Sequence, residues 1–260
     1  MDSQLLIHEM AVPVSAERHG DWSLEVTNDF GWCAIANSVP LMTVEFFNAA
    51  SEYCIAFNRT HAGVMPCVIL GLRRDENVYL TPTGGWRAAY VPAFVRRYPF
   101  MYSLSEDGES FALCVDESFS HFNTEGRGER LFTGDKRPAP SLDRMFRLLE
   151  QYRIEFQRTR AFCSKLAEFD LLEPLRLDIK PNDGEKASIE GLMTVNRDKA
   201  RSLAPKQVSD LARSDEFGLL QLHLQSMRHI PTASNHSGNK AVVYKNRTPV
   251  VHRDRFSASM

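Results

Sequence analysis

The stretch between residues 141 and 166 limits the possible folds of this chain more than any other part of the sequence. Its apolar residues recur at spacings of three and four, which is the period of one face of an α-helix. Ser141 predicts the N-cap, Asp143 suits the first turn, and Pro174 lies beyond the end of the helix. Such a stripe must be buried, either against a partner helix or, as we expect, against strands of the same chain. The stripe consists of Leu142, Met145, Leu149, Tyr152, Phe156, Cys163 and Leu166.

The residues before this helix predict a series of short strands. Trp22, Leu24 and Val26 alternate with polar residues, as in a half-buried strand. Further apolar runs are separated by Asn, Arg, His and Gly residues, which is the pattern of successive strands. These runs lie at residues 54–58, 64–72, 77–80, 100–105 and 110–118. The first half of the chain is therefore predicted to be rich in β-structure.

One helix is expected among these strands, in the residues that follow Pro40. Leu41, Val44, Phe47 and either Ala50 or Ala49 fall at helical spacing, so the pattern predicts a helix with these residues on one face. The stretch with this pattern is LMTVEFFNAASEY, residues 41–53.

The second half of the chain predicts mostly helices. Residues 188–195 indicate one returning strand, and helices are expected at 196–203, 205–214 and 216–227. His223 is expected to face solvent or to cap a helix. The fold class is therefore α+β, with a β-rich part up to about residue 138 packed against a helix-rich part. We expect one domain over residues 1–231 and a flexible basic C-terminal tail over residues 232–260, in which AVVY could form a weak strand.

The densest segment of the sequence lies at residues 83–100, TGGWRAAYVPAFVRRYPF. Gly84 and Gly85 predict a tight turn, and Pro92 and Pro99 make a long regular strand or helix here improbable. One interpretation is an aromatic and Arg-lined groove for a peptide or ligand, whose arginines bind a carboxylate or another anion. The alternative is a corner of the core whose arginines point outward. The candidate partner-binding residues are Trp86, Arg87, Tyr90, Arg96, Arg97, Tyr98 and Phe100.

The same segment carries a family resemblance. TGGW followed by YVPAFVRRYPF resembles the signature of the bacterial SapC family, and the likeness extends from about Trp32 to about Met227. Matching pieces in the same order include VEFFNAASEYCIAFN, NVYL and GLMTVNRDKARSL. The resemblance implies an association with a paracrystalline surface layer, and it brings no established catalytic residues. SapC-like proteins are also often encoded beside iron-dependent oxygenases, tryptophan halogenases and outer-membrane receptors.

Composition and cysteine usage give further limits. A net charge of −2 gives no reason to expect nucleic acid or an anionic membrane as the main partner. The five cysteines are scattered and odd in number, so we expect reduced core thiols. The N-terminus lacks the features of a secretory signal, and no apolar run is long enough to span a membrane. We expect a cytoplasmic protein, with surface-layer association only through a dedicated export route.

No established catalytic constellation is present in the sequence. The chain lacks a phosphate-binding GxxxxGK[ST] loop, a GxGxxG motif, a GxSxG elbow, and HExxH or CxxC metal spacing. His252 and Asp254 match the first two ligands of a non-haem iron triad, but no further histidine follows them. We therefore predict neither a cofactor nor a metal site.

Three hypotheses for function remain. The first, which we favour, is a non-enzymatic protein that binds a protein or peptide partner through the segment 83–100. The second is an accessory subunit of a peptide or protein tailoring system that acts with an iron-dependent oxygenase or a tryptophan halogenase. The third is an enzyme of unfamiliar type, with Glu45, Asp116 or His121 in acid/base roles in a pocket lined by Trp86 and Tyr90.

Overall fold

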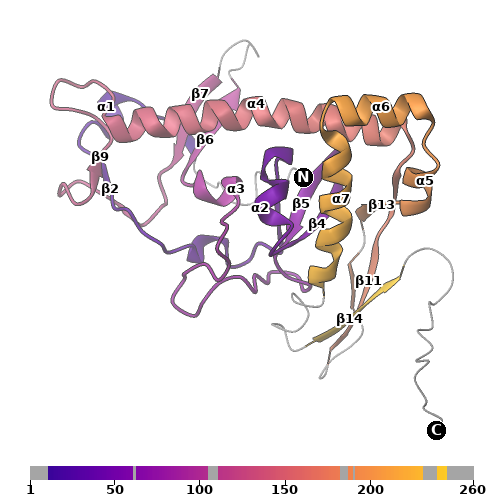
Figure 1. Ribbon diagram of the computed structural model, residues 1–260. Coiled ribbons are helices and arrows are strands. Elements are labelled where there is room, and N and C mark those ends of the chain that lie inside the picture. The colour runs from indigo at the N-terminus through magenta and orange to yellow at the C-terminus, as the bar shows by residue number, and fades with distance from the viewer. Residues whose placement is uncertain are drawn as a thin grey trace, which may run out of the picture.

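The computed structural model describes residues 11–60, 63–104, 111–181, 187–189, 191–230 and 239–244. The fold is α+β, as predicted, with antiparallel sheets of short strands and a helix-rich C-terminal half. Figure 1 shows the long helix α4 (Pro140–Glu168) running across the molecule, with most of the N-terminal half below it in this view. The helices that follow it in the sequence lie near its C-terminal end.

Helix α4 buries the predicted apolar stripe against the strands, which confirms that its partner lies in the same chain. It packs against strand β5 (Gly63–Ile69) and strand β6 (Phe100–Leu104). The predicted N-cap is wrong, because Ala139 caps the helix and Ser141 donates its hydroxyl to the carbonyl of Arg130, at 2.6 Å. Pro140 occupies the first position, where its missing N–H and fixed φ suit a helix start, so the helix begins two residues earlier than predicted.

The central sheet joins the two halves of the chain. Its five strands are antiparallel and run in the order β10, β13, β4, β5, β3. Two of them, β10 (Leu172–Pro174) and β13 (Leu192–Val195), come from the C-terminal half. The other strands are β3 (Ser38–Pro40), β4 (Cys54–Thr60) and β5. The halves therefore share one sheet, and the predicted strands at 54–58 and 64–72 are confirmed.

Two smaller sheets lie toward the N-terminal end of α4. In the first, β7 (Phe111–Asp116) lies between β1 (Ala11–Pro13) and β6, which confirms the strands predicted at 100–105 and 110–118. In the second, β2 (Ser23–Leu24) pairs with β8 (Phe122–Asn123) and β9 (Glu129–Arg130). The predicted strand at Trp22–Val26 is thus shorter than expected, because pairing stops at Leu24 and Val26 is 81% exposed. The helical turn α1 (Ala16–His19) connects β1 to β2, and the 3₁₀ turn η2 (Gly31–Cys33) lies between β2 and β3 of the central sheet.

The helix expected after Pro40 is present in two short pieces. These are the 3₁₀ turn η3 (Thr43–Glu45) and helix α2 (Phe46–Ala49). The predicted face is wrong for two residues, because Val44 is 63% exposed and Phe47 is 79% exposed, whereas Phe46 is buried. A 3₁₀ turn advances by about three residues per turn, so it rotates the following residues away from the positions of a continuous α-helix.

The predicted C-terminal elements are present, with two differences. The strand expected at 188–195 is divided into β12 (Ala187–Ile189) and β13 by Gly191, whose φ is +88°. His223 is fully buried in α7 instead of facing solvent. The helices are α5 (Arg197–Arg201), α6 (Pro205–Arg213), α7 (Glu216–Ser226) and the 3₁₀ turn η4 (Met227–His229).

Part of the expected C-terminal tail belongs to a sheet. Residues of the AVVY run lie in β14 (Asn239–Tyr244), which pairs antiparallel with β11 (Arg176–Pro181). The strand that the sequence allowed here is therefore confirmed. The other tail residues, 232–238 and 245–260, lie outside the described residues.

All five cysteines are buried and free, as predicted. Burial raises the pKa of the thiols of Cys33, Cys67 and Cys163 to about 12. Among the described helices, none is both long enough and apolar enough to cross a membrane.

Candidate functional site

The segment 83–100 starts with the predicted turn. Leu80 and Trp86 form an antiparallel bridge around it, and Gly84 has a φ of +83°. A Cβ atom at Gly84 would lie 2.0 Å from Oδ1 of Asp29, and the backbone N–H of Phe30 donates to the carbonyl of Gly84 at 2.8 Å. Only glycine fits both the backbone angle and this close approach.

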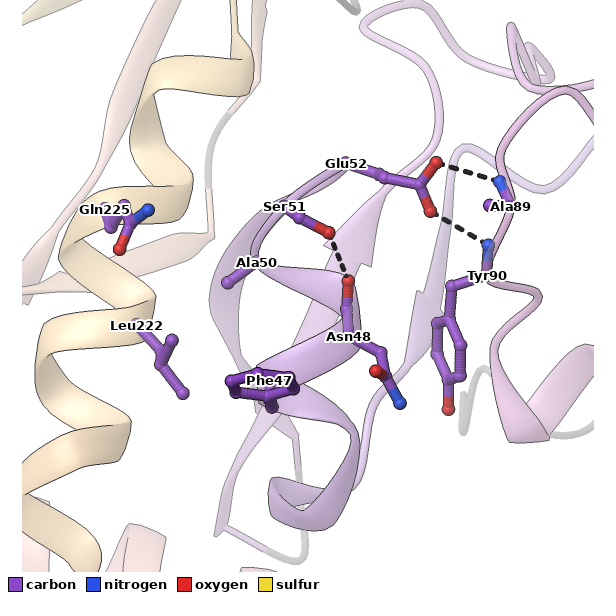
Figure 2. A pocket seen from close by; sticks show the side chains of 9 residues that line it. All are labelled: Phe47, Asn48, Ala50, Ser51, Glu52, Ala89, Tyr90, Leu222 and Gln225. Atoms are coloured by element: carbon purple, nitrogen blue, oxygen red, sulfur yellow. Dashed lines mark hydrogen bonds between the residues drawn. The ribbon is translucent and has the colours of Figure 1, made fainter.

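After the turn, the chain is attached to the end of α2 by Glu52 and Tyr53. The two carboxylate oxygens of Glu52 accept the backbone N–H groups of Ala89 and Tyr90, both at 2.8 Å (Figure 2). The Tyr53 hydroxyl donates to the carbonyl of Tyr90 and accepts the indole N–H of Trp86 at 2.6 Å. The resembling pieces VEFFNAASEYCIAFN and TGGWRAAYVPAF are therefore hydrogen-bonded to each other.

Glu45 provides a second attachment point for the same segment. Its side chain is buried, and Oε1 accepts the Tyr90 hydroxyl at 2.8 Å and the Ala93 N–H at 2.7 Å. Its Oε2 accepts the Met42 N–H at 2.8 Å. Burial, and then the charge of Glu45, raise the pKa of the Tyr90 hydroxyl, so it remains a hydrogen-bond donor. The Ala93 contact fixes the start of helix α3 (Ala93–Arg96).

A groove of about 720 Å³ passes over α2 beside these contacts, and we call it the α2 groove. In Figure 2, Leu222 and Gln225 of α7 border it on one side, Ala89 and Tyr90 lie on the other, and Phe47 lies between them. The Asn48 side chain points toward the Tyr90 side, and the Ser51 hydroxyl donates to the Asn48 carbonyl at 2.8 Å. The lining residues are Phe47, Asn48, Ala50, Ser51, Glu52, Ala89, Tyr90, Leu222 and Gln225.

A smaller cavity of about 260 Å³ lies between α2 and α4, and we call it the α4 cavity. It shares Asn48 and Tyr90 with the α2 groove and extends to Arg96 and Tyr152. Glu155 lies in its wall and accepts from Gln151 at 2.9 Å and from Arg158 at 2.7 Å. Two exposed apolar side chains line these hollows: Phe47 lines the α2 groove, and Val44 lines the α4 cavity.

The predicted partner-binding residues fall into three classes of exposure. Arg87 and Arg96 are exposed, and each holds its Nε–H against a backbone carbonyl, that of Leu80 at 2.7 Å and that of Val91 at 2.9 Å. Trp86, Tyr90 and Tyr98 are half-buried, and Arg97 and Phe100 are buried.

The structure brings only some of these residues together. The guanidinium of Arg96 lies 5.7 Å from the ring centre of Tyr90, and both residues line the α4 cavity. Tyr98 points elsewhere, because its ring stacks on Trp32 at 4.0 Å and its hydroxyl donates to Asp116 at 3.1 Å. The candidate surface thus centres on Tyr90 and Arg96 and continues to α2 and α7.

Sequence reasoning did not assign Val44, Phe47, Leu222 or Gln225 to this surface. A signal was present in the adjacent aromatic pair Phe46 and Phe47, because neighbouring residues on a helix point about 100° apart. When one of the pair is buried, the other is directed away from the core. The contribution of α7 has no such local signal, since it depends on how distant elements pack.

The three candidate acid/base residues have separate surroundings. Glu45 lines the α4 cavity, Asp116 accepts from Ser118 and Tyr98, and His121 lies 3.8 Å from Asp29. The described contacts of these residues do not join them into one pocket, so the geometry gives no support to the enzyme hypothesis. In the part of the chain that the structure describes, no three His, Cys, Asp or Glu side chains gather as a metal site would require.

Comparison with known proteins adds the family. No curated protein and no solved structure matches the chain. The sequence model of the SapC family matches residues 14–232, which include the α2 groove, the α4 cavity and all seven predicted partner-binding residues. The chain therefore belongs to the SapC family.

Proposed function

We propose that this protein binds a peptide segment of a partner protein in the α2 groove. The observation that carries the proposal is the 79% exposure of Phe47 beside the groove, next to Val44 at 63%. Burying an aromatic side chain in a protein contact contributes more than burying most other residues, and aromatic residues are frequent at binding hot spots. An apolar side chain of the partner would pack against Phe47 and Leu222.

The charges beside the groove favour an acidic residue in the same peptide. Arg87 and Arg96 are exposed, and backbone carbonyls hold their Nε–H groups. Among the described residues, the one contact of their terminal nitrogens is that of Arg96 with the Tyr90 hydroxyl, at 3.5 Å. The nearby carboxylates of Glu45 and Glu52 already accept donors from the chain itself. The partner therefore meets available cationic groups, and we infer a segment with an apolar residue close to an Asp or Glu.

The attachment of the segment 86–93 supports a pre-formed binding surface. Its backbone is held by Glu45, Glu52 and Tyr53, so the position of Tyr90 does not depend on a ligand. A surface that is ordered before binding loses less conformational entropy when the complex forms.

The family suggests two classes of partner for this surface. One is a surface-layer protein, which would require a dedicated export route. The other is an iron-dependent oxygenase or tryptophan halogenase, to which this protein would be an accessory subunit. Both classes would use the α2 groove, so one set of variants tests either.

A peptide-library selection on the purified protein tests the proposal. We expect enriched peptides that share an apolar residue near an acidic one. Phe47→Ala should weaken their affinity by roughly 30-fold, which corresponds to about 2 kcal/mol for a hot-spot residue. Arg96→Gln should weaken binding less, and more strongly at low salt than at high salt.

Val26→Ala is the matched control, because Val26 is also an apolar residue with a large exposed fraction, 81%. It should leave peptide affinity unchanged. If peptides selected on the natural protein bound Phe47→Ala and Val26→Ala equally well, the α2 groove would not be the binding site.

A further inference from the structure

Arg97 is a buried cation whose side chain is surrounded by aromatic rings. It is only 5% exposed, and its guanidinium carbon lies 4.5 Å from the ring centre of Phe94 and 5.1 Å from that of Tyr152. Its backbone is fixed, because the Arg97 N–H donates to Ala93 and the Arg97 carbonyl accepts from Phe100. The side chain packs against Tyr152 of α4, in contrast to that of the neighbouring Arg96, which is exposed.

Arg97 has no anionic partner among the described residues. Its Nε is buried without a hydrogen-bond partner, and no carboxylate in the described part of the chain forms an ion pair with the guanidinium. The Tyr152 hydroxyl is likewise buried without a partner. An arginine remains protonated in a protein, and a buried charge without a counter-ion is strongly unfavourable. Contacts with aromatic rings offset only part of that cost.

The free groups of Arg97 suit a planar anion. The ring contacts leave its N–H groups without an acceptor, and its two terminal nitrogens are the part of the guanidinium that still reaches solvent. A carboxylate binds two guanidinium N–H groups side by side in one plane. The adjacent acids do not take this role, since Glu45 and Glu155 accept hydrogen bonds from other residues.

We propose that the terminal nitrogens of Arg97 are the binding site for the carboxylate group of a small organic acid. The site does not depend on the peptide proposed for the α2 groove. It is built by residues of two elements, the end of α3 and the middle of α4, so its occupation would stabilise their packing.

Titration of the natural protein with acetate tests this assignment directly. In protein labelled with ¹⁵N-arginine, the Nε–H signal of Arg97 is identified by its loss in Arg97→Lys. At constant ionic strength, acetate should shift this signal in a saturable manner, and chloride should not. Inorganic phosphate separates a carboxylate site from a general anion site, and should give no saturable shift.

The matched variants are Arg97→Met, which removes the buried cation, and Arg96→Met, which removes the exposed cation next to it. Acetate should raise the melting temperature of the natural protein and of Arg96→Met, with saturation, and should leave that of Arg97→Met unchanged. If Arg97→Met does not fold, the acetate titration of the natural protein, followed through the Arg97 Nε–H signal, decides whether the proposal holds. The proposal is overturned if the Arg97 signal does not respond to acetate, or responds equally to chloride or phosphate.

Discussion

Tyr90 lines both the α2 groove and the α4 cavity, and three other residues fix its position. Its backbone N–H is held by Glu52, its carbonyl by Tyr53 and its hydroxyl by Glu45. The ring lines both the α2 groove and the α4 cavity, and Arg96 lies over it. The position of this one side chain is therefore set by three residues from a different part of the sequence.

Glu45→Gln is predicted to destabilise the fold. A glutamine has one acceptor oxygen, so it cannot replace a carboxylate that accepts from Met42, Tyr90 and Ala93, and its amide would face N–H donors. We expect a loss of about 3 kcal/mol in the free energy of unfolding, measured with urea. Glu150→Gln is the control, because its partner Arg153 is partly exposed, and it should change stability by less than about 0.5 kcal/mol. Equal effects of the two variants would contradict the role given to Glu45.

At the scale of elements, the surface depends on how α2 and the turn before Trp86 are held. Thr43 of η3 donates its N–H to the Thr159 hydroxyl of α4 at 2.9 Å, which fixes the start of α2 under the long helix. On the other side, His223 of α7 connects Ile55 of β4 and Val195 of β13, at 3.0 and 3.1 Å. The borders of the α2 groove are thus attached to the core independently.

Gly84→Ala tests the turn. The new Cβ would lie 2.0 Å from Asp29, and the backbone angle is one that alanine rarely adopts. We expect a loss of about 2 kcal/mol in stability, together with a changed fluorescence of Trp86, which follows the turn. Gly134→Ala is the control, since its Cβ would meet no atom within 4 Å. An unchanged melting temperature for Gly84→Ala would show that the turn tolerates a side chain.

The elements themselves could largely be predicted from local pattern. The stripe of α4 follows from its helical period, and the strands β4 to β7 follow from short apolar runs bounded by polar residues. The strand predicted at 77–80 from a similar run is wrong, because only Leu80 forms a bridge there. The burial of Glu45 and His223 could not be predicted, since the groups that satisfy them lie about 45 and 168 residues away in sequence. The exposure of Val44 and Phe47 depends on the change from a 3₁₀ turn to an α-helix, which helical spacing does not reveal.

At the scale of the molecule, the two halves of the chain form one structure. Strands β10 and β13 enter the sheet built by the N-terminal half, and α4 covers residues from both. The core includes aromatic rings and all five cysteine thiols. These thiols, and the buried Tyr53 and Tyr79, are shielded from water. The residues that line the α2 groove and the α4 cavity are therefore held by the same core that stabilises the fold.

This burial predicts a loss of stability at alkaline pH. A thiol with an ordinary pKa of 9.0 ionises in the unfolded chain, whereas Cys33, Cys67 and Cys163 remain neutral in the folded chain up to about pH 12. Ionisation therefore favours unfolding between these values, by up to about 1.4 kcal/mol per pH unit for each thiol. Urea unfolding at pH 7.5, 9 and 10.5 should show the decline, and Cys67→Ala should make it less steep. A pH-independent stability would contradict the burial of the thiols.

The most direct test of the central claim is site-specific photo-crosslinking in the host. A photoreactive phenylalanine analogue replaces Phe47, and the same analogue at Val26 serves as the control for exposure. We predict one crosslinked partner at position 47 that is absent at position 26 and is competed by a peptide selected on the α2 groove. Equal products at both positions, or a product at position 47 that the peptide does not reduce, would contradict a partner-binding role for this groove.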